Sequence, residues 1–189
     1  MIEAELKARV RDPAALRVRL LTLAVGESSV YHDSYYDWPA GNLGTDGREL
    51  RLRLVDAEGR RSALLTYKEP AVESISGSKP EYETQVEDPS AVDVMLRGLG
   101  LACIVAFEKH CTNYRFAASG RQMLATVVRV PELDGTFIEV ETMTQDDDTD
   151  AALADVRALL NQLGIVEDDL TSEQYTDAVL KARQQGSAG

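Results

Sequence analysis

The 189-residue chain has only two cysteines and two histidines, and it has no long apolar run. Cys103, Cys111, His32 and His110 lack the CxxC or HxxxH spacing of common zinc sites, so the sequence does not predict one. The cysteines are expected to be reduced thiols. No stretch approaches the roughly 20 apolar residues of a membrane helix, and no signal peptide is visible at the N-terminus. We therefore expect a cytoplasmic protein with no membrane partner.

Basic residues are also scarce. Twenty lysines and arginines face 32 acidic residues, which gives a formal net charge of −12. Nucleic-acid-binding surfaces are normally basic, so no nucleic-acid partner is expected. A small phosphate ligand remains compatible with this charge, because a few buried cations outweigh exposed, screened acids. The GxGxxG and GxxxxGK[ST] patterns are absent, which removes the two commonest nucleotide-phosphate cradles.

Charged residues alternate with apolar residues along several predicted strands. The first seven residues place Glu3, Glu5 and Lys7 on one strand face and apolar side chains on the other. The same alternation recurs at Arg51/Arg53, Glu81/Glu83 and Glu139/Glu141. A closed sheet that turned these faces inward would enclose carboxylates and cations, as a container for a polyanion and its metal ions. In the alternative, one sheet face is solvated and the charges only contact water.

The chain predicts an α+β domain over residues 1–184 and a flexible tail over residues 185–189. Helices are expected after Asp12-Pro13 and Asp88-Pro89, because Asp is a good N-cap and Pro suits the first helical position. Two more helices are expected after the acidic run at 146–150 and over about 172–184. Residues 70–80 are expected to form a mobile loop. The eight or nine predicted strands, mostly antiparallel, cover about 2–10, 31–37, 48–55, 61–69, 79–87, 102–109, 112–118, 122–130 and 135–142.

An ordered set of motifs extends over residues 1–163. It comprises Glu3-x-Glu5-x-Lys7, Asp33-Ser34-Tyr35-Tyr36-Asp37, Leu50-Arg51-Leu52-Arg53, Leu65-Thr66-Tyr67-Lys68, Glu81-Tyr82-Glu83, Glu108-Lys109 and Phe137-Ile138-Glu139-Val140-Glu141. In this order, the set resembles the CYTH superfamily, also called triphosphate tunnel metalloenzymes. The pattern is most similar to class IV adenylyl cyclases and thiamine-triphosphatase-like proteins.

The resemblance implies an eight-stranded antiparallel β-barrel, open as a tunnel, with flanking helices and a C-terminal helical segment. It implies a small organic polyphosphate or phosphate ester as substrate, Mg²⁺ or Mn²⁺ as cofactor, and P–O cleavage by water or by a ribose 3′-hydroxyl. The protein would be a monomer or homodimer. The implied phosphate-binding residues are Lys7, Arg51, Arg53, Lys68 and Lys109, with Lys7 and Lys68 also catalytic. The implied metal ligands are Glu3, Glu5, Glu139 and Glu141 for one ion, with Glu81 and Glu83 near a second.

Two departures from the family pattern affect the expected site. Cys111 stands where the family usually has an arginine, and Arg115 is expected to supply a phosphate contact from further along the strand. Residues 127–131 contain no acid where the family places an aspartate, and Arg129 is expected to contact phosphate there. These changes indicate either a redirected substrate or a polyphosphate-binding module without turnover. A third possibility is an acidic structural domain. Tyr35, Tyr36 and Tyr67 are expected either in the barrel wall or stacked on a base.

Overall fold

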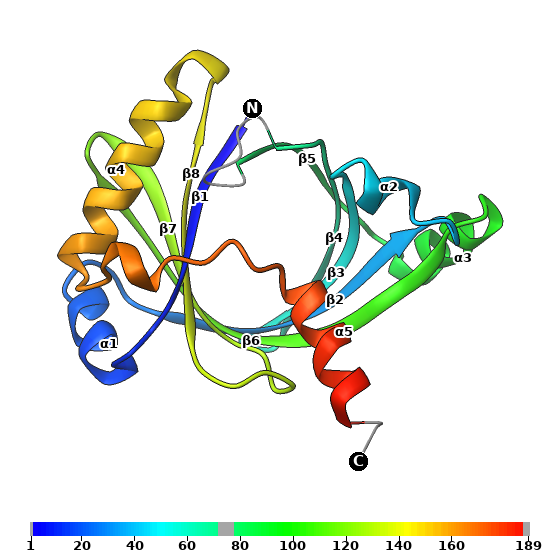
Figure 1. Ribbon diagram of the computed structural model, residues 1–189, viewed down its shortest axis with the longest axis horizontal. Coiled ribbons are helices and arrows are strands. Elements are labelled where there is room, and N and C mark those ends of the chain that lie inside the picture. Colours follow the sequence, from blue (N-terminus) through cyan, green and yellow to red (C-terminus); the bar gives the residue numbers. More distant parts are fainter. Residues whose placement is uncertain (1, 72–77, 187–189) are drawn as a thin grey trace.

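The computed structural model describes residues 2–71 and 78–186, and within them eight strands close into one antiparallel barrel (Figure 1). The strands are β1 (Ile2–Arg9), β2 (Glu27–Asp37), β3 (Glu49–Ala57), β4 (Arg60–Lys68), β5 (Lys79–Gln85), β6 (Ala102–Ala118), β7 (Arg121–Arg129) and β8 (Phe137–Thr144). Their order around the barrel is β1-β5-β4-β3-β2-β6-β7-β8. The barrel closes because β1 pairs with β5 on one side and with β8 on the other.

Strand β6 corrects one sequence prediction. Two strands were expected, over 102–109 and 112–118, but the structure has one continuous strand of 17 residues. His110 lies between the two predicted strands, and it pairs with Val30 of β2 and with Arg129 of β7. No turn-forming residue interrupts the alternation at this point, so the backbone stays extended. One long strand therefore joins the two halves of the sheet.

The helices cover the outer face and one end of the barrel. They are α1 (Pro13–Leu21), α2 (Asn42–Thr45), α3 (Pro89–Gly98), α4 (Thr149–Gln162) and α5 (Tyr175–Gly186), with 3-10 turns η1 (Asp146–Asp148) and η2 (Glu167–Asp169). The predicted N-caps are confirmed: the Asp12 carboxylate accepts from the backbone N–H of Ala15, and Asp88 accepts from Ser90 and Ala91. None of the helices in the described part of the chain combines the length and apolar character needed to span a bilayer.

The main apolar core lies outside the barrel, between β1, β8 and α4. The even-numbered residues of β1, such as Ala4 and Leu6, pack with Val140 of β8 against Val156 and Leu160 of α4. Because side chains alternate across a strand, burying this apolar set against α4 turns Glu3, Glu5 and Lys7 to the inside of the barrel. Helix packing on the outer face therefore fixes the orientation of the charged face.

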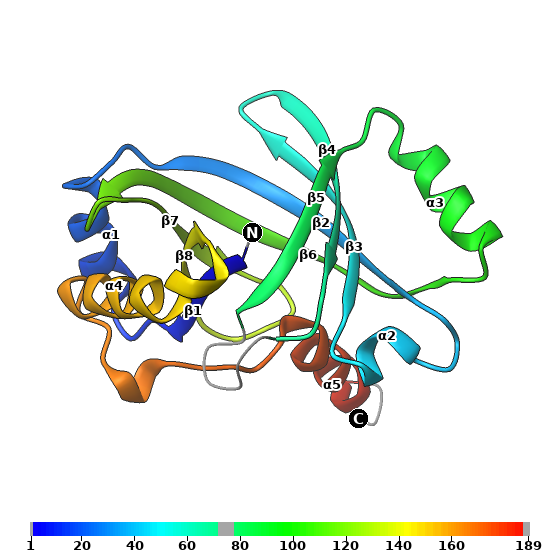
Figure 2. The ribbon, with the colours of Figure 1, turned by 90° about the horizontal axis from the view of Figure 1, so that it is seen from above.

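The C-terminal segment runs across one end of the barrel before α5 begins. Leu170 bridges to Ala8 of β1, and the Thr171 N–H donates to the Lys7 carbonyl at 2.9 Å. Figures 1 and 2 both show this segment and α5 at the same end of the barrel. The last helix, expected from residue 172, begins only at Tyr175, after a segment that contacts β1 through Leu170, Thr171 and the Glu173 carbonyl.

Two expected mobile regions lie partly outside the described residues. In the expected loop over 70–80, residues 72–77 are not described, and β5 begins at Lys79. In the expected tail over 185–189, residues 185 and 186 complete α5, and residues 187–189 are not described. The predicted boundary of the domain at residue 184 therefore stays a prediction.

Candidate functional site

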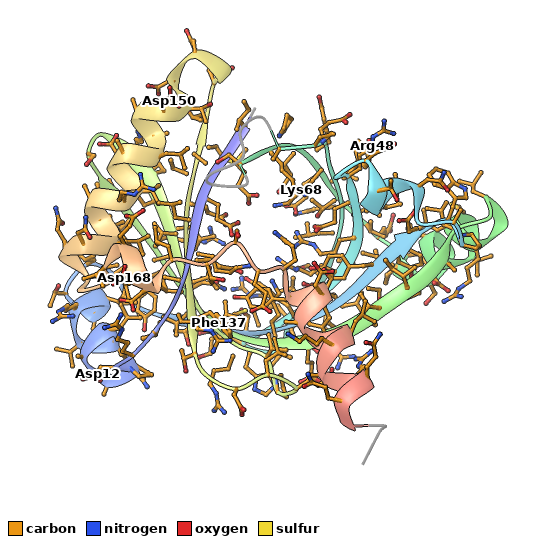
Figure 3. The ribbon with its side chains drawn as sticks, viewed as in Figure 1. Asp12, Arg48, Lys68, Phe137, Asp150 and Asp168 are labelled. Carbon is orange, nitrogen blue, oxygen red and sulfur yellow. The ribbon has the colours of Figure 1, made fainter. Side chains whose placement is uncertain are left out.

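The barrel encloses a cavity of about 290 Å³ with a strongly charged lining. Every sequence-predicted site residue except Arg129 lines it, and Figure 3 shows Lys68 on the inner side of the barrel wall. The carboxylates of the lining are Glu3, Glu5, Glu49, Glu81, Glu83, Glu139 and Glu141. The cations of the lining are Lys7, Arg51, Arg53, Lys68, Lys79, Lys109 and Arg115. The two signs are therefore matched in number.

Three carboxylates converge at the β1–β8 seam. Glu5 and Glu141 are direct cross-strand partners, and Glu3 lies two residues along on the same face. One carboxylate oxygen from each of the three lies within 4.8 Å of the others. Burial, with the neighbouring Glu139 and Glu3 charges, raises the pKa of Glu5 to about 7. Burial, with Glu3 and Glu5, raises the pKa of Glu141 well above its ordinary value. This all-oxygen set fits a hard divalent cation, which would offset the repulsion.

The other three predicted metal ligands are engaged elsewhere. Glu139 lies 3.8 Å from the Lys109 ammonium, and Glu81 lies 2.8 Å from the Lys68 ammonium. Glu83 accepts a hydrogen bond of 2.8 Å from the Thr66 hydroxyl. The structure thus gathers three of the four glutamates expected at the first ion, and Glu81 and Glu83 each contact a different side chain.

Among the predicted phosphate-binding cations, Lys68 and Arg53 make the shortest contacts with carboxylates. Lys68 contacts both Glu3 and Glu81; burial opposes its charge, but these acids raise the pKa of Lys68 above its ordinary value. The Arg53 guanidinium donates two hydrogen bonds to Asp33, at 2.6 and 2.8 Å. Asp33 was not expected in the site. Its direct cross-strand pairing with Arg53 is the signal that would have found it, once the register was known.

Two buried donors of the cavity lining have no acceptor in normal hydrogen-bond geometry among the described residues. They are Nε of Arg51 and the hydroxyl of Tyr175. Arg51 Nη2 lies 3.3 Å from the Thr66 hydroxyl, so only part of its guanidinium is engaged. Burial, the nearby Glu139 charge and a hydrogen-bonding interaction with the Glu139 carboxylate raise the pKa of Tyr175 above its ordinary value, so its hydroxyl stays protonated. Glu139 is thus close to this hydroxyl, but the contact lacks normal hydrogen-bond geometry. The sequence motifs end at residue 163 and gave no sign of Tyr175, which reaches the cavity from α5.

Lys7 and Lys109 lie at the same end of the cavity as Tyr175. Their ammonium nitrogens lie 4.5 and 4.4 Å from the centre of the Tyr175 ring. Lys7 also donates to the carbonyl of Glu173. Burial lowers the pKa of Lys7, and Glu139 and Glu5 partly oppose that shift. These contacts hold two cations beside Tyr175.

Arg129 does not belong to the cavity, and the expectation that it contacts phosphate there was wrong. Within β7, Leu124 and Thr126 line the cavity, whereas Arg129 lines a hollow on the outer face together with His110. The alternation of side chains along β7 decides this orientation. The residues of β7 that pair with Glu141 and Glu139 are Leu124 and Thr126, so neither supplies an acid.

The remaining residues singled out in the sequence lie as follows. Cys111 is buried in an apolar cluster with Val128 and Phe137, and burial raises the pKa of its thiol to about 12. Arg115 lines the cavity from an exposed position on β6.

The three tyrosines singled out in the sequence lie in apolar surroundings. Tyr35 stacks on Phe107 with ring centres 5.6 Å apart. Tyr36 and Tyr67 belong to the apolar cluster beneath α3, outside the tunnel. Of the two expected roles, Tyr36 and Tyr67 therefore have the structural one, in the barrel wall.

Comparison with known proteins identifies the family. The sequence model of the CYTH domain matches residues 1–175. A Methanocaldococcus jannaschii protein named "Putative adenylate cyclase MJ0240" is 25% identical over 182 residues, which cover 94% of this chain and 98% of that protein. The PH1819 protein from Pyrococcus horikoshii has a similar structure, with a TM-score of 0.81, 23% identity, and coverage of 95% of this chain and 98% of that one.

A third similar structure comes from Hippeastrum. It is the structure of a protein named "Putative adenylyl cyclase HpAC1", which is described as having a dominant triphosphatase activity. It matches with a TM-score of 0.65 and 19% identity, over 96% of each chain. At these identities the solved structures show a shared fold. Because the family model spans nearly the whole chain and the observed barrel has the same architecture, this protein belongs to the CYTH domain family.

Proposed function

We propose that this protein is a divalent-metal-dependent enzyme that hydrolyses a P–O–P bond of a triphosphate held in the tunnel. The observation that carries the proposal is the Glu3–Glu5–Glu141 cluster. It lies in one cavity with the buried cations Arg51 and Lys109, which can donate hydrogen bonds to phosphate oxygens. CYTH proteins bind triphosphates and nucleotides in this tunnel. A carboxylate cluster beside cations suits a ligand that carries both negative oxygens and a bound metal ion.

Charge balance supports a metal-bound polyphosphate over a free one. The seven carboxylates and seven cations of the lining nearly cancel, so a bare triphosphate would bring uncompensated negative charge into a partly buried site. Mg²⁺ or Mn²⁺ fits the carboxylate oxygens and, when bound, would neutralise and polarise phosphate oxygens. The net charge of the protein does not oppose entry, because exposed acids are screened by salt.

The cations have different tasks in this proposal. Arg51 keeps an unpaired donor for a phosphate oxygen, and Lys7 and Lys109 hold charge at the Tyr175 end. Arg53 is fixed by Asp33, which makes it a rigid charge in the wall. Lys68 touches Glu3 of the metal cluster, so its ammonium can stabilise charge that develops on the leaving phosphate oxygen.

The aromatic residues favour hydrolysis over cyclisation of ATP. A cyclase must hold the nucleoside so that its 3′-hydroxyl attacks, and a base commonly stacks on an aromatic face. Among the described lining residues, Tyr31 has Arg53 over its ring, Tyr35 stacks on Phe107, and Tyr175 has two lysines over its ring. The cavity therefore offers contacts for phosphates rather than for a base. The Hippeastrum protein is an example in which a cyclase-like name and triphosphatase activity go together.

A binding module without turnover is the second candidate. This candidate is favoured by the residues that pair with Glu141 and Glu139, because Leu124 and Thr126 add no acid to the cavity. Cys111 likewise adds no cation. Such a module would use the same cavity to bind a polyphosphate. It would lack a ligand or a charge needed to stabilise the transition state.

A ³¹P NMR time course with tripolyphosphate and ATP, each with Mg²⁺ or Mn²⁺, tests the proposal. We expect metal-dependent release of orthophosphate, and strong loss of the rate in Glu141→Gln. Glu108→Gln, on the outer face beside His110, is the matched control and should keep the rate. Binding without turnover would favour the module. Formation of cyclic AMP with pyrophosphate would replace the hydrolase assignment with a cyclase.

A further inference from the structure

Tyr175 separates the charged tunnel from a second cavity. The tunnel cavity and a neighbouring cavity of about 210 Å³ share Tyr175 and no other described residue in their linings. The second cavity is also lined by the cations Arg9 and Lys181, the acids Asp134 and Glu173, and Phe137. The Tyr175 side chain thus stands as a partition between the tunnel and a second cavity, in which Arg9 and Lys181 lie among acids.

The partition is held firmly in place. The residues before it pair with β1, and Lys7 donates to the Glu173 carbonyl. The Tyr175 ring makes an edge contact with Phe137, with ring centres 5.3 Å apart, and Val179 one turn later in α5 is fully buried. Tyr175 itself is only 6% exposed. Its position is therefore set by backbone pairing and apolar packing before any ligand binds.

The tunnel side of the partition suits the end of an anionic chain. The buried hydroxyl of Tyr175 has the Glu139 carboxylate nearby but no acceptor in normal hydrogen-bond geometry, so a ligand oxygen can supply a better acceptor. The ammonium groups of Lys7 and Lys109 lie over the ring. The terminal phosphate of a polyphosphate carries more negative charge than an internal phosphate. One hydrogen-bond donor and two cations at the Tyr175 end of the cavity therefore suit it.

We propose that Tyr175 determines the length of polyphosphate that the tunnel accepts. Its hydroxyl donates to the terminal phosphate beside Lys7 and Lys109, and its ring prevents longer chains from reaching Arg9 and Lys181. This role rests on the proposed polyphosphate-binding function and extends it, because it assigns a residue of α5 to the choice among chains of different length.

Two substitutions separate the two parts of this role. Tyr175→Phe keeps the ring and removes the donor, so the Kd for tripolyphosphate should rise about tenfold or more, as for loss of a hydrogen bond to a charged group. Tyr175→Ala opens the partition, so the affinity for tetrapolyphosphate relative to tripolyphosphate should rise severalfold. Tyr82→Phe and Tyr82→Ala are matched controls, because Tyr82 is 62% exposed, and both ligands should bind to them as to wild type.

Calorimetric titration with Mg²⁺ and each ligand gives both affinities, and circular dichroism checks the fold of each variant. A ratio of two affinities is insensitive to a partly unfolded fraction, so it reports on the partition even if Tyr175→Ala is less stable. One outcome would overturn the role of Tyr175 and leave the proposed function standing. In it, wild type binds tripolyphosphate, Tyr175→Phe binds it with the same Kd, and Tyr175→Ala has the wild-type ratio of tetrapolyphosphate to tripolyphosphate affinity. No binding of either ligand to wild type would overturn the proposed function together with this role.

Discussion

The buried pair of Asp33 and Arg53 is the interaction in the tunnel wall with the best-defined geometry. Both hydrogen bonds are short, the Asp33 side chain is fully buried, and Arg53 also lies over the Tyr31 ring. A buried ion pair adds little net stability over an apolar pair of the same shape, but breaking it leaves an unpaired charge. Asp33 therefore orients Arg53. Replacing Asp33 should lower both the stability of the fold and the affinity for the ligand.

Asp33→Asn should reduce the free energy of unfolding by about 3–5 kcal/mol, because it leaves Arg53 buried without a counter-charge. Urea unfolding at pH 7 measures the loss. Burial opposes the charge of Asp33, but Arg53 lowers the pKa of Asp33 below its ordinary value. Stabilisation from the ionised carboxylate is therefore present above about pH 4 and is lost as pH falls toward the folded-state pKa.

The gap in stability between wild type and Asp33→Asn should accordingly stay constant from pH 7 to about pH 4 and narrow only below that. Asp56→Asn is the control, because Asp56 pairs with the exposed Arg61 and surface pairs contribute little. A variant as stable as wild type, or a gap that closes between pH 7 and pH 5, would contradict the assigned role of Asp33.

Glu5→Gln should stabilise the metal-free protein, because it relieves repulsion within the carboxylate cluster. The pKa of Glu5, raised to about 7, means that its ionisation destabilises the fold progressively as pH rises from about 4.5 to 7. The gain should therefore grow over this window and reach about 1–3 kcal/mol at pH 8. Thermal unfolding in EDTA measures it. Millimolar Mg²⁺ or Mn²⁺ should raise the Tm of wild type and have little effect on the variant.

At the scale of elements, the fit of α5 onto the barrel end decides the shape of the site. Tyr175 and Val179 lie one turn apart and both join the apolar cluster of Phe107, Val130 and Phe137. Through Tyr175, this cluster contacts Lys7 and Lys109, whose ammonium nitrogens lie 4.5 and 4.4 Å from the ring centre. The helix is thus a structural part of the tunnel, and its docking depends on a small number of buried side chains.

Val179→Ala should cost about 1–3 kcal/mol of unfolding free energy, because it removes two methyl groups from a fully buried position. Val94→Ala on α3 is the matched control, since Val94 is 68% exposed and its truncation should cost little. Chemical denaturation of both variants provides the comparison. Equal and small losses would mean that α5 is not tightly docked on the barrel.

At the scale of the whole molecule, an acidic protein encloses a cavity of balanced charge. The barrel turns seven cations and seven carboxylates inward, so the formal net charge of −12 is carried by the rest of the protein. Neither metal nor polyphosphate alone preserves the balance in the cavity, since each brings charge of one sign. The two should therefore bind cooperatively, each raising the affinity for the other.

Tripolyphosphate and Mg²⁺ added together should raise the Tm by more than the sum of their separate effects. Differential scanning fluorimetry over a grid of both concentrations measures this coupling. Sodium sulfate at matched ionic strength is the control for general salt effects, and should give no such coupling. Strictly additive shifts would contradict a shared site. Because free Mg²⁺ binds tripolyphosphate in solution, the shifts are compared at equal free concentrations.

Local sequence determined which side chains share a face of each strand. The alternation at Glu3, Glu5 and Lys7, and at Glu139 and Glu141, predicted their common orientation, and all five line the cavity. The same rule failed to place Arg129, because residues 127–130 are apolar except for this arginine and give no alternation to follow. The pairing of β7 with β8 places Leu124 and Thr126 opposite Glu141 and Glu139, and alternation along β7 then turns Arg129 outward with His110.

The ordered motifs also indicated the family, and the resemblance to that family implied the closed barrel. Tertiary structure alone decided which charges meet. Cross-strand register joined Asp33 to Arg53 and Glu5 to Glu141, and side-chain reach then paired Glu139 with Lys109 rather than with the carboxylate cluster. Tyr175 entered the site because residues distant in the chain pair with β1 and pack at its end. Such long-range contacts depend on the whole packed barrel and leave no periodic signal in the sequence.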